Sequence, residues 1–367
     1  MTEEMIRLVH VSKTFPGAAD PAVADLSFEV GRGEFVTLVG PSGCGKTTTL
    51  KMINRIIEPS SGEIWVDGIA AIDTPAPQLR RSIGYVIQQI GLFPHRTIAQ
   101  NIATVPELLG WERRRIQERV GQLAEMVGLE SAQLDRYPSE LSGGQQQRVG
   151  VARALAADPP VLLMDEPFGA VDPIVRTRLQ DEFLSLQAEL QKTVVFVTHD
   201  IDEAIRMGDR IAILNIGGVL EQFDTPDRIL SQPASPFVAD FLGEDRGIKR
   251  LSLIRLDQLD LPLGPAVEAD AGLDEARRVM EREGTDWVAV LHSGALAGWV
   301  WGKDLVGVER VGDLKVADFR VTVDCNASLR EALDAIVNTH NNVGMVVDEG
   351  RYQGMLTMDL LTAELIG

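Results

Sequence analysis

A glycine-rich segment between a buried strand and a helix constrains this chain more than any other feature. Residues 40–47, Gly-Pro-Ser-Gly-Cys-Gly-Lys-Thr, match the pattern G-x-x-x-x-G-K-[ST]. The run EFVTLVG, which leads into them, is typical of a buried strand, and the run TTTLKMINRII, which begins at Thr47, is typical of a helix. In this setting the backbone N–H groups of the loop and the positive end of the helix surround a phosphate group. The segment therefore predicts a parallel α/β fold with a phosphate-binding loop.

The predicted nucleotide contacts come from this loop and from the first turn of the helix. Lys46 is long enough to reach the β- and γ-phosphates, and the Thr47 hydroxyl is placed to ligate Mg²⁺. The residues of this segment that are predicted to bind ATP are Gly40, Pro41, Ser42, Gly43, Cys44, Gly45, Lys46, Thr47 and Thr48.

Two consecutive carboxylates end a second buried run. The segment VLLMDE, residues 161–166, carries Asp165 and Glu166 directly after four apolar residues. A strand in this position brings Asp165 beside the phosphate loop, where a carboxylate holds Mg²⁺, usually through water. Glu166 is then predicted to orient or deprotonate the attacking water. A third buried run, TVVFVTHD at residues 193–200, completes the strand signals of a parallel sheet.

A second anion site is predicted at the motif Leu-Ser-Gly-Gly-Gln. Ser142, Gly143, Gly144 and Gln145 open a helical run, QQQRVGVARAL, and again offer backbone N–H groups at a helix start. One chain that binds one nucleotide does not need two phosphate cradles. Two chains facing head to tail would need both, because each chain would then serve the ATP held by the other.

With these motifs the chain resembles the ABC ATPase family over about residues 5–243. The resemblance implies ATP and Mg²⁺ as cofactors and a P-loop NTPase fold, with a RecA-like core and a helical subdomain at about residues 95–157. It also implies a homodimer and contacts with membrane subunits. The pattern contains every catalytic group of the family, so it predicts an ATP hydrolase.

Four further residues take roles from this resemblance. Phe15 lies where the family stacks an aromatic ring on adenine, and Gln88 matches the glutamine that senses the γ-phosphate and Mg²⁺. Asp172 matches the loop that crosses the dimer interface, and His199 matches the histidine that contacts the γ-phosphate. Catalysis is thus assigned to Glu166, His199 and Gln88, and Mg²⁺ binding to Thr47, Gln88 and Asp165. Ordinary core packing of Phe15, and plain surface positions for Gln88 and His199, are the alternatives.

An internal repeat follows a polar segment at residues 243–249, which is predicted to be a linker. A gapless offset of 56 positions aligns residues 271–280 with 327–336 and residues 296–305 with 352–361. Each copy is predicted to fold as helix, short strand, turn, short strand, helix. The repeat resembles a tandem pair of CBS modules, which we expect to be α+β and to follow the ATPase domain.

The predicted domain organisation is therefore an ATPase domain followed by two short modules. An ABC ATPase fused to a CBS pair resembles the subunits that energise importers of glycine betaine, carnitine and choline, in which the pair regulates transport. An ATPase for another solute, such as an amino acid, and a soluble ABC ATPase acting on translation or DNA are the alternatives. The predicted boundaries are residues 1–243 for the ATPase domain, 249–307 for the first module and 308–367 for the second.

How the CBS pair would regulate transport is open at this stage. Modules of this kind that bind nucleotides end their second strand with Ser or Thr and carry Asp three residues later. The first copy has Trp301 with Asp304, and the second has Thr357 with Leu360, so an adenine nucleotide and a structural role both remain. A response to ionic strength is the third hypothesis. It rests on the carboxylates Asp270, Asp274, Glu275, Glu281 and Glu283.

Composition restricts the partners and the location. The net charge of -19 argues against nucleic acid as a partner, because a polyanion would be repelled. No run approaches the roughly 20 apolar residues that span a bilayer, and the first residues lack a secretion signal. We therefore expect the chain at the cytoplasmic side of the membrane. The expected partners are a second copy, two transmembrane permeases and, indirectly, an extracytoplasmic substrate-binding protein.

Overall fold

The computed structural model divides the chain into two compact units, residues 1–243 and residues 244–367. Each unit has its own sheets and its own hydrophobic core. Among the described residues, no helix combines the length and the apolar character that crossing a membrane requires. The structure describes residues 3–87, 91–169, 171–319, 321–337 and 343–366.

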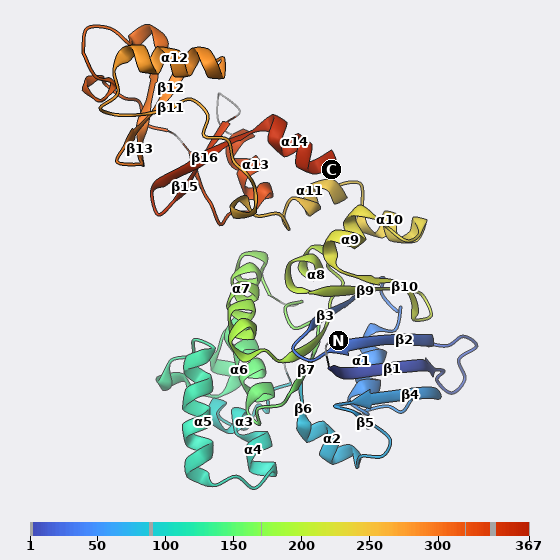
Figure 1. The fold of residues 1–367 in the computed structure, drawn as a ribbon. Helices are drawn as coiled ribbons and strands as arrows, with labels where there is room; N and C mark the ends of the chain where they lie inside the picture. Colours follow the sequence, from blue (N-terminus) through green and yellow to red (C-terminus); the bar gives the residue numbers. More distant parts are fainter. Residues whose placement is uncertain (1–2, 88–90, 170, 320, 338–342, 367) are drawn as a thin grey trace. The chain divides into compact units, whose positions relative to one another are not determined.

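A six-stranded sheet forms the centre of the first unit (Figure 1). Its order is β10-β9-β3-β8-β7-β6, and all neighbours are parallel except β10, which runs antiparallel to β9. The three buried runs of the sequence form β3, β7 and β8, so the predicted parallel sheet is confirmed. The strands are β3 (Phe35–Val39), β6 (Ile83–Val86), β7 (Val161–Asp165), β8 (Thr193–Val197), β9 (Arg210–Asn215) and β10 (Val219–Asp224).

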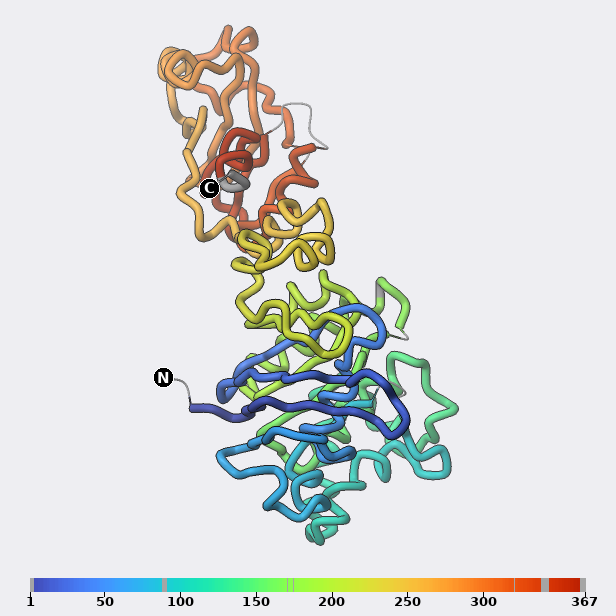
Figure 2. The backbone as a smooth tube through the Cα atoms, turned by 90° about the vertical axis from the view of Figure 1, so that its right-hand side faces the viewer, coloured from blue at the N-terminus to red at the C-terminus, as the bar shows by residue number. Residues whose placement is uncertain are grey.

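A second, antiparallel sheet has the order β2-β1-β4-β5. Its strands run side by side across the unit, with the long β1 next to β2 (Figure 2). The helix α1 (Lys46–Ile53) contacts β4 of this sheet and β7 and β8 of the parallel sheet. The strands are β1 (Glu4–Lys13), β2 (Val23–Gly31), β4 (Ser61–Val66) and β5 (Ile69–Ala70).

Both faces of the parallel sheet are covered, which explains why every residue of β3, β7 and β8 is buried. In β7, Val161 and Leu163 join the core that includes α1 and the antiparallel sheet. Leu162 and Met164 point the other way, into the core formed with the helices on the opposite face. Asp165, at the end of this strand, points by the same alternation to the face of Val161 and Leu163, toward α1.

Helices make up most of the segment that the sequence predicts as helical, residues 95–157. A capping box at Thr97 starts α3, and a second one at Ser142 starts α6. The helices of the first unit besides α1 are α2 (Ala76–Ser82), α3 (Ile98–Ile102), α4 (Thr104–Leu108), α5 (Arg113–Met126), α6 (Gly143–Leu155), α7 (Pro173–Leu190), α8 (Ile201–Met207), α9 (Pro226–Ser231) and α10 (Pro236–Leu242). Short 3₁₀ turns at Ser131–Gln133 and Pro138–Glu140 separate α5 from α6.

The second unit is built on one six-stranded sheet of order β11-β12-β13-β16-β15-β14. It starts with a helix, α11 (Arg246–Arg250), so the segment predicted as a linker, residues 243–249, contains most of a short helix. Lys249 of this helix pairs with Asp245, four residues earlier, at 2.7 Å, and this ion pair supports the single turn. The remaining elements are β11 (Ala266–Glu268), α12 (Leu273–Glu283), β12 (Trp287–His292), β13 (Ala295–Trp301), β14 (Thr322–Asp324), α13 (Leu329–Val337), β15 (Val343–Asp348), β16 (Arg351–Thr357) and α14 (Met358–Ile366).

The two copies of the repeat fold alike. Each has a short strand, a helix and a hairpin, and corresponding strands begin 56 positions apart, as in β11 at residue 266 and β14 at residue 322. Gly298 and Gly354 occupy the same place beside a β-bulge, with φ of +152° and +156°. A Cβ on Gly298 would lie 2.5 Å from the Ala317 carbonyl oxygen, so a larger residue does not fit there.

The copies differ after the hairpin. The second copy ends in the helix α14, but the first has only a 3₁₀ turn at Gly302–Asp304. The prediction of a closing helix is therefore wrong for the first copy. Gly302 donates its N–H to the Asp286 carbonyl oxygen at 2.7 Å, and Gly307 adopts a φ of +82°. Both conditions oppose a continuous helix between these glycines.

Candidate nucleotide site

The phosphate loop, residues 40–45, connects β3 to α1. Gly40 has a φ of +150°, and a Cβ at this position would lie 2.1 Å from the Leu214 carbonyl oxygen. Gly45 has a φ of +96°, and its Cβ would lie 2.5 Å from the Ala22 carbonyl oxygen. Both positions accept only glycine. Among the residues that the structure describes, no side chain caps α1, so the N–H groups of its first turn remain for an anion at the sheet edge.

The Lys46 ammonium lies within this loop. Its Nζ donates hydrogen bonds to the carbonyl oxygens of Gly40 at 2.7 Å and of Pro41 at 3.1 Å. The side chain is 7% exposed, so its charge is largely withdrawn from water. The Cys44 thiol is buried in the core below the loop, and its Sγ atom lies 3.6 Å from Lys46 Nζ. A fixed, poorly hydrated cation beside the helix N-terminus suits a polyphosphate.

Thr47 and Asp165 are brought together from positions 118 residues apart. The Thr47 hydroxyl donates to the Asp165 carboxylate at 2.8 Å. Burial raises the pKa of Asp165, the neighbouring Glu166 charge raises it further, and the Thr47 hydrogen bond opposes both. A hydroxyl and a desolvated carboxylate at the edge of a phosphate loop are the oxygen ligands that Mg²⁺ accepts. The pair therefore fits the predicted magnesium site.

Glu166 follows β7 and His199 follows β8, and their side chains meet at the ends of these neighbouring strands. The Glu166 Oε2 atom lies 3.3 Å from His199 Nδ1. Glu166 adopts a φ of 43°, which is strained for a residue with a side chain, and its N–H donates to the Val197 carbonyl oxygen at 2.9 Å. This backbone bond ties the end of β7 to the end of β8. It sets the Glu166 carboxylate next to the imidazole and one residue beyond Asp165.

A buried polar cluster that sequence reasoning missed supports the His199 turn. The Thr198 hydroxyl donates to the Glu203 carboxylate, which also accepts a hydrogen bond from the Gln180 amide at 2.8 Å. Glu203 is 8% exposed, and burial raises its pKa. The Asp200 carboxylate caps α8 by accepting from the N–H groups of Asp202 and Glu203. A Glu in the first turn of a helix is ordinary, so nothing in the sequence marks its burial.

The second predicted anion site lies on the surface. Ser142 caps α6, accepting from the Gln145 N–H at 3.3 Å, while its own N–H donates to the Gln145 side chain at 2.9 Å. Ser142 and Gly143 are exposed. Among the described residues, these side-chain hydrogen bonds join Ser142 and Gln145 only to each other. The motif is therefore open to a partner molecule.

The remaining predicted residues are placed as follows. Phe15 is 40% exposed, and the Lys13 ammonium lies 5.4 Å from its ring centroid. Because Phe15 is exposed to this extent, it is not an ordinary core residue. The loop that carries it ends at Ala22, whose carbonyl oxygen lies beside Gly45 of the phosphate loop. Asp172 is exposed immediately before α7. Gln88 lies outside the described residues, and its predicted role stays a prediction.

Comparisons with known proteins show which families and relatives the chain is similar to. The family description "ABC transporter" matches residues 23–169, and the description "CBS domain" matches residues 311–367. The glycine betaine/carnitine/choline transport ATP-binding protein OpuCA of Bacillus subtilis is 48% identical over 352 residues, which cover 94% of this chain and 92% of the relative. The osmoprotectant import ATP-binding protein OsmV of Salmonella typhimurium is 45% identical over 364 residues, with coverages of 97% and 95%.

A solved structure shares the nucleotide unit. The dimeric post-hydrolysis state of the ATP-binding cassette MJ0796, bound to ADP and Pi, is 36% identical with a TM-score of 0.54. The matched region covers 60% of this chain and 98% of that cassette. The chain therefore belongs to the ABC transporter family, as an ATP-binding and ATP-hydrolysing subunit. Its particular relatives are the ATP-binding proteins of quaternary-amine and osmoprotectant transport, so the resemblance predicted from the motifs is confirmed.

Proposed function

We propose that this chain hydrolyses ATP to drive the uptake of quaternary ammonium osmoprotectants such as glycine betaine, carnitine and choline. One observation carries the proposal. The similarity to OpuCA extends over 94% of the chain and therefore includes both the nucleotide unit and the C-terminal unit. The proposed assembly contains two copies of this chain and two permeases at the cytoplasmic side of the membrane. A substrate-binding protein on the outer side would deliver the solute.

In the proposed reaction, water attacks the γ-phosphate, and the chain acts mainly by positioning groups and by neutralising charge. Bound Mg²⁺, held by Thr47, Asp165 and Gln88, would supply part of that neutralisation. Lys46 binds the terminal phosphates. Glu166 accepts the proton of the attacking water, and His199, 3.3 Å from that carboxylate, orients it and contacts the γ-phosphate.

A groove on the helical segment supports the proposal of a permease contact. It is lined by parts of α3, α4 and α5, among them Ala103, Ile116 and Val120, with Trp111 at the turn between α4 and α5. Leu108 at this turn is 60% exposed. A groove with both apolar and charged side chains, among them Glu107 and Arg113, fits an amphipathic helix from the cytoplasmic side of a permease.

Reconstitution with the cognate permeases and binding protein tests the substrate class. We expect glycine betaine, added with its binding protein, to raise ATP hydrolysis several-fold and to accumulate inside proteoliposomes. Lys46→Ala should abolish both signals, because the ammonium at the phosphate loop is lost. Stimulation by an amino acid in place of glycine betaine would identify the alternative importer and contradict the proposed substrate.

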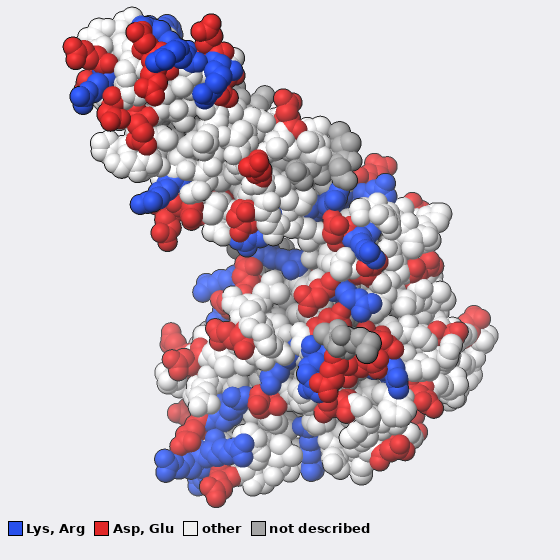
Figure 3. Space-filling view, viewed as in Figure 1, with Lys and Arg blue, Asp and Glu red and all other residues white. Residues whose placement is uncertain are grey.

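Regulation by the C-terminal unit is also part of the proposal, and its charges differ from the expected acidic cluster. The carboxylates of α12 alternate with Arg277, Arg278 and Arg282, and acidic and basic side chains are mixed over this helix (Figure 3). Arg277 pairs with Asp274 at 2.8 Å. A mixed surface responds to salt through local ion pairs, not through a large negative field.

The adenine-nucleotide hypothesis for this unit is weaker in the second copy. The Thr357 hydroxyl accepts from the Leu360 N–H at 3.3 Å and so caps the start of α14. In the first copy, Trp301 packs edge-on against Trp299 with ring centroids 4.8 Å apart. Thr357 and Trp301, the positions that would hold the ribose, thus have local structural partners instead. We therefore favour salt sensing over nucleotide binding as the form of regulation.

Deletion of residues 244–367 should leave transport active and flatten its dependence on salt. Between 0.15 M and 1 M salt the screening length falls from about 8 Å to about 3 Å, which weakens exposed ion pairs. Uptake measured across that range by full-length and truncated transporters checks this. A parallel fluorescence titration with adenine nucleotides uses Trp287, Trp299 and Trp301, all in the first copy. An unchanged salt response after deletion, together with no response to adenine nucleotides, would leave the unit a structural one.

A further inference from the structure

The helices α6 and α7 carry two predicted dimer elements at their N-termini. Ser142 caps α6, and Asp172 immediately precedes α7. The two helices pack together near these ends, since a Cβ on Gly144 would lie 3.5 Å from Val175 and 3.9 Å from Leu179. Any tilt of α6 against α7 would therefore move Ser142 relative to Asp172.

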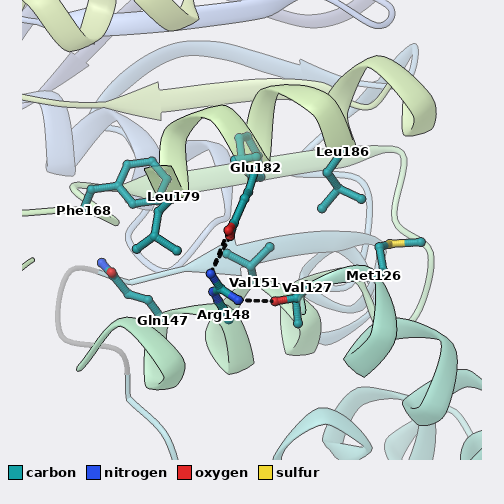
Figure 4. A pocket seen from close by; sticks show the side chains of 10 residues that line it. Met126, Val127, Gln147, Arg148, Val151, Phe168, Leu179, Glu182 and Leu186 are labelled. Atoms are coloured by element: carbon teal, nitrogen blue, oxygen red, sulfur yellow. Dashed lines mark hydrogen bonds and ion pairs between the residues drawn. The ribbon is translucent and has the colours of Figure 1, made fainter. Parts of the chain in front are cut away.

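One arginine further along α6 connects three helices (Figure 4). Arg148 pairs with Glu182 of α7 at 2.7 Å. The same guanidinium donates to the carbonyl oxygens of Val127 and Gly128, both at 3.2 Å, at the end of α5. The fork geometry of a guanidinium allows both contacts at once, which a lysine cannot reproduce.

The packing around the Arg148–Glu182 ion pair indicates why this link between α6 and α7 matters. A pocket of about 40 Å³ that opens to the surface, lined mainly by apolar side chains such as Val151, Phe183 and Leu186, lies between α6 and α7 beside the ion pair. Apolar packing between the helices is therefore incomplete at this level. The side chains of Arg148 and Glu182 are 20% and 38% exposed, so their pair is only partly screened by water.

We propose that Arg148 is a positioning residue that holds α5, α6 and α7 in one arrangement and so aligns Ser142 with Asp172 for ATP hydrolysis in the dimer. The inference rests on the proposed action of Ser142 on the partner chain's ATP. Arg148 touches neither the nucleotide loop nor the carboxylates of the site in the described structure. Its loss should therefore change turnover and leave nucleotide affinity intact.

A matched control is present on α7 itself. Arg178 also contacts Glu182, at 3.0 Å, but it lies one turn away on the same helix and is 77% exposed. Arg148→Gln and Arg178→Gln thus each remove one arginine from the same carboxylate, and only the first breaks the link between helices. Glu182→Gln and the double variant Arg148→Gln/Glu182→Gln complete a cycle, and the double variant removes both charges of the pair together.

We expect Arg148→Gln to lower kcat by about tenfold, within the usual range of coupling between linked sites, with KM for ATP changed by less than about twofold. Arg178→Gln should retain the parental kcat. The double variant should be no slower than Arg148→Gln alone, because both substitutions remove the same link. Thermal unfolding of each variant, followed by circular dichroism, separates this effect from loss of folded protein.

The inference would be overturned by parental turnover in Arg148→Gln, by an equal loss in Arg178→Gln, or by additive losses in the double variant. A loss explained entirely by a lower folded fraction would do the same. Failure of the proposed function is distinguishable from these, because Ser142→Arg would then hydrolyse ATP normally. If Ser142→Arg is inactive and Arg148→Gln is not impaired, only the positioning role is wrong.

Discussion

Glu166→Gln is expected to lower ATP hydrolysis by about two to four orders of magnitude, the usual worth of a positioned general base. The amide keeps the size of the side chain but accepts a proton poorly. ATP binding should remain nearly intact, because the phosphate contacts of Lys46 and of the loop N–H groups are untouched. Hydrolysis is measured by phosphate release, and binding by equilibrium titration with a fluorescent ATP analogue.

The same variant should accumulate an ATP-bound dimer that elutes earlier in size-exclusion chromatography. Asp202→Asn is a suitable control, because this carboxylate is exposed in the first turn of α8 and makes no predicted contact with the nucleotide. It should hydrolyse ATP at the parental rate and show no trapped dimer. Parental hydrolysis by Glu166→Gln would show that another group activates the water.

Ser142→Arg is expected to abolish hydrolysis without weakening ATP binding to the isolated chain. Ser142 is exposed at the start of α6, and its side-chain contact is with Gln145, so a long cation there meets only a partner molecule. Ser142→Asn is the control for the helix cap, because asparagine caps a helix as well as serine does. Binding is measured at protein concentrations that keep the chain monomeric.

Mixing two defective chains tests the head-to-tail arrangement directly. In a dimer of Ser142→Arg with Lys46→Ala, one site combines an intact Lys46 with an intact Ser142, and the other site lacks both. At most one of the two sites can recover. A loss of ATP affinity in monomeric Ser142→Arg would mean that the motif serves its own nucleotide and would contradict the head-to-tail model.

The sequence alone was sufficient where a contact depends on neighbours along the chain. The phosphate loop, the helix start at Ser142 and the buried runs of β3, β7 and β8 are local patterns, each with one favourable backbone arrangement. The 56-residue offset predicted a duplicated module for the same reason, since both copies repeat the strand and glycine positions. These features follow from steric limits and hydrogen-bonding needs of short segments.

Tertiary structure decided what depends on burial and on partners far along the chain. The cluster of Gln180, Thr198 and Glu203 gathers polar residues that look ordinary in sequence, and only folding withdraws them from water. Arg148 meets Glu182 because two helices from separate segments pack side by side. The missing helix of the first module likewise reflects the hydrogen bond of Gly302 to Asp286. In each case the deciding energy comes from contacts that no local pattern encodes.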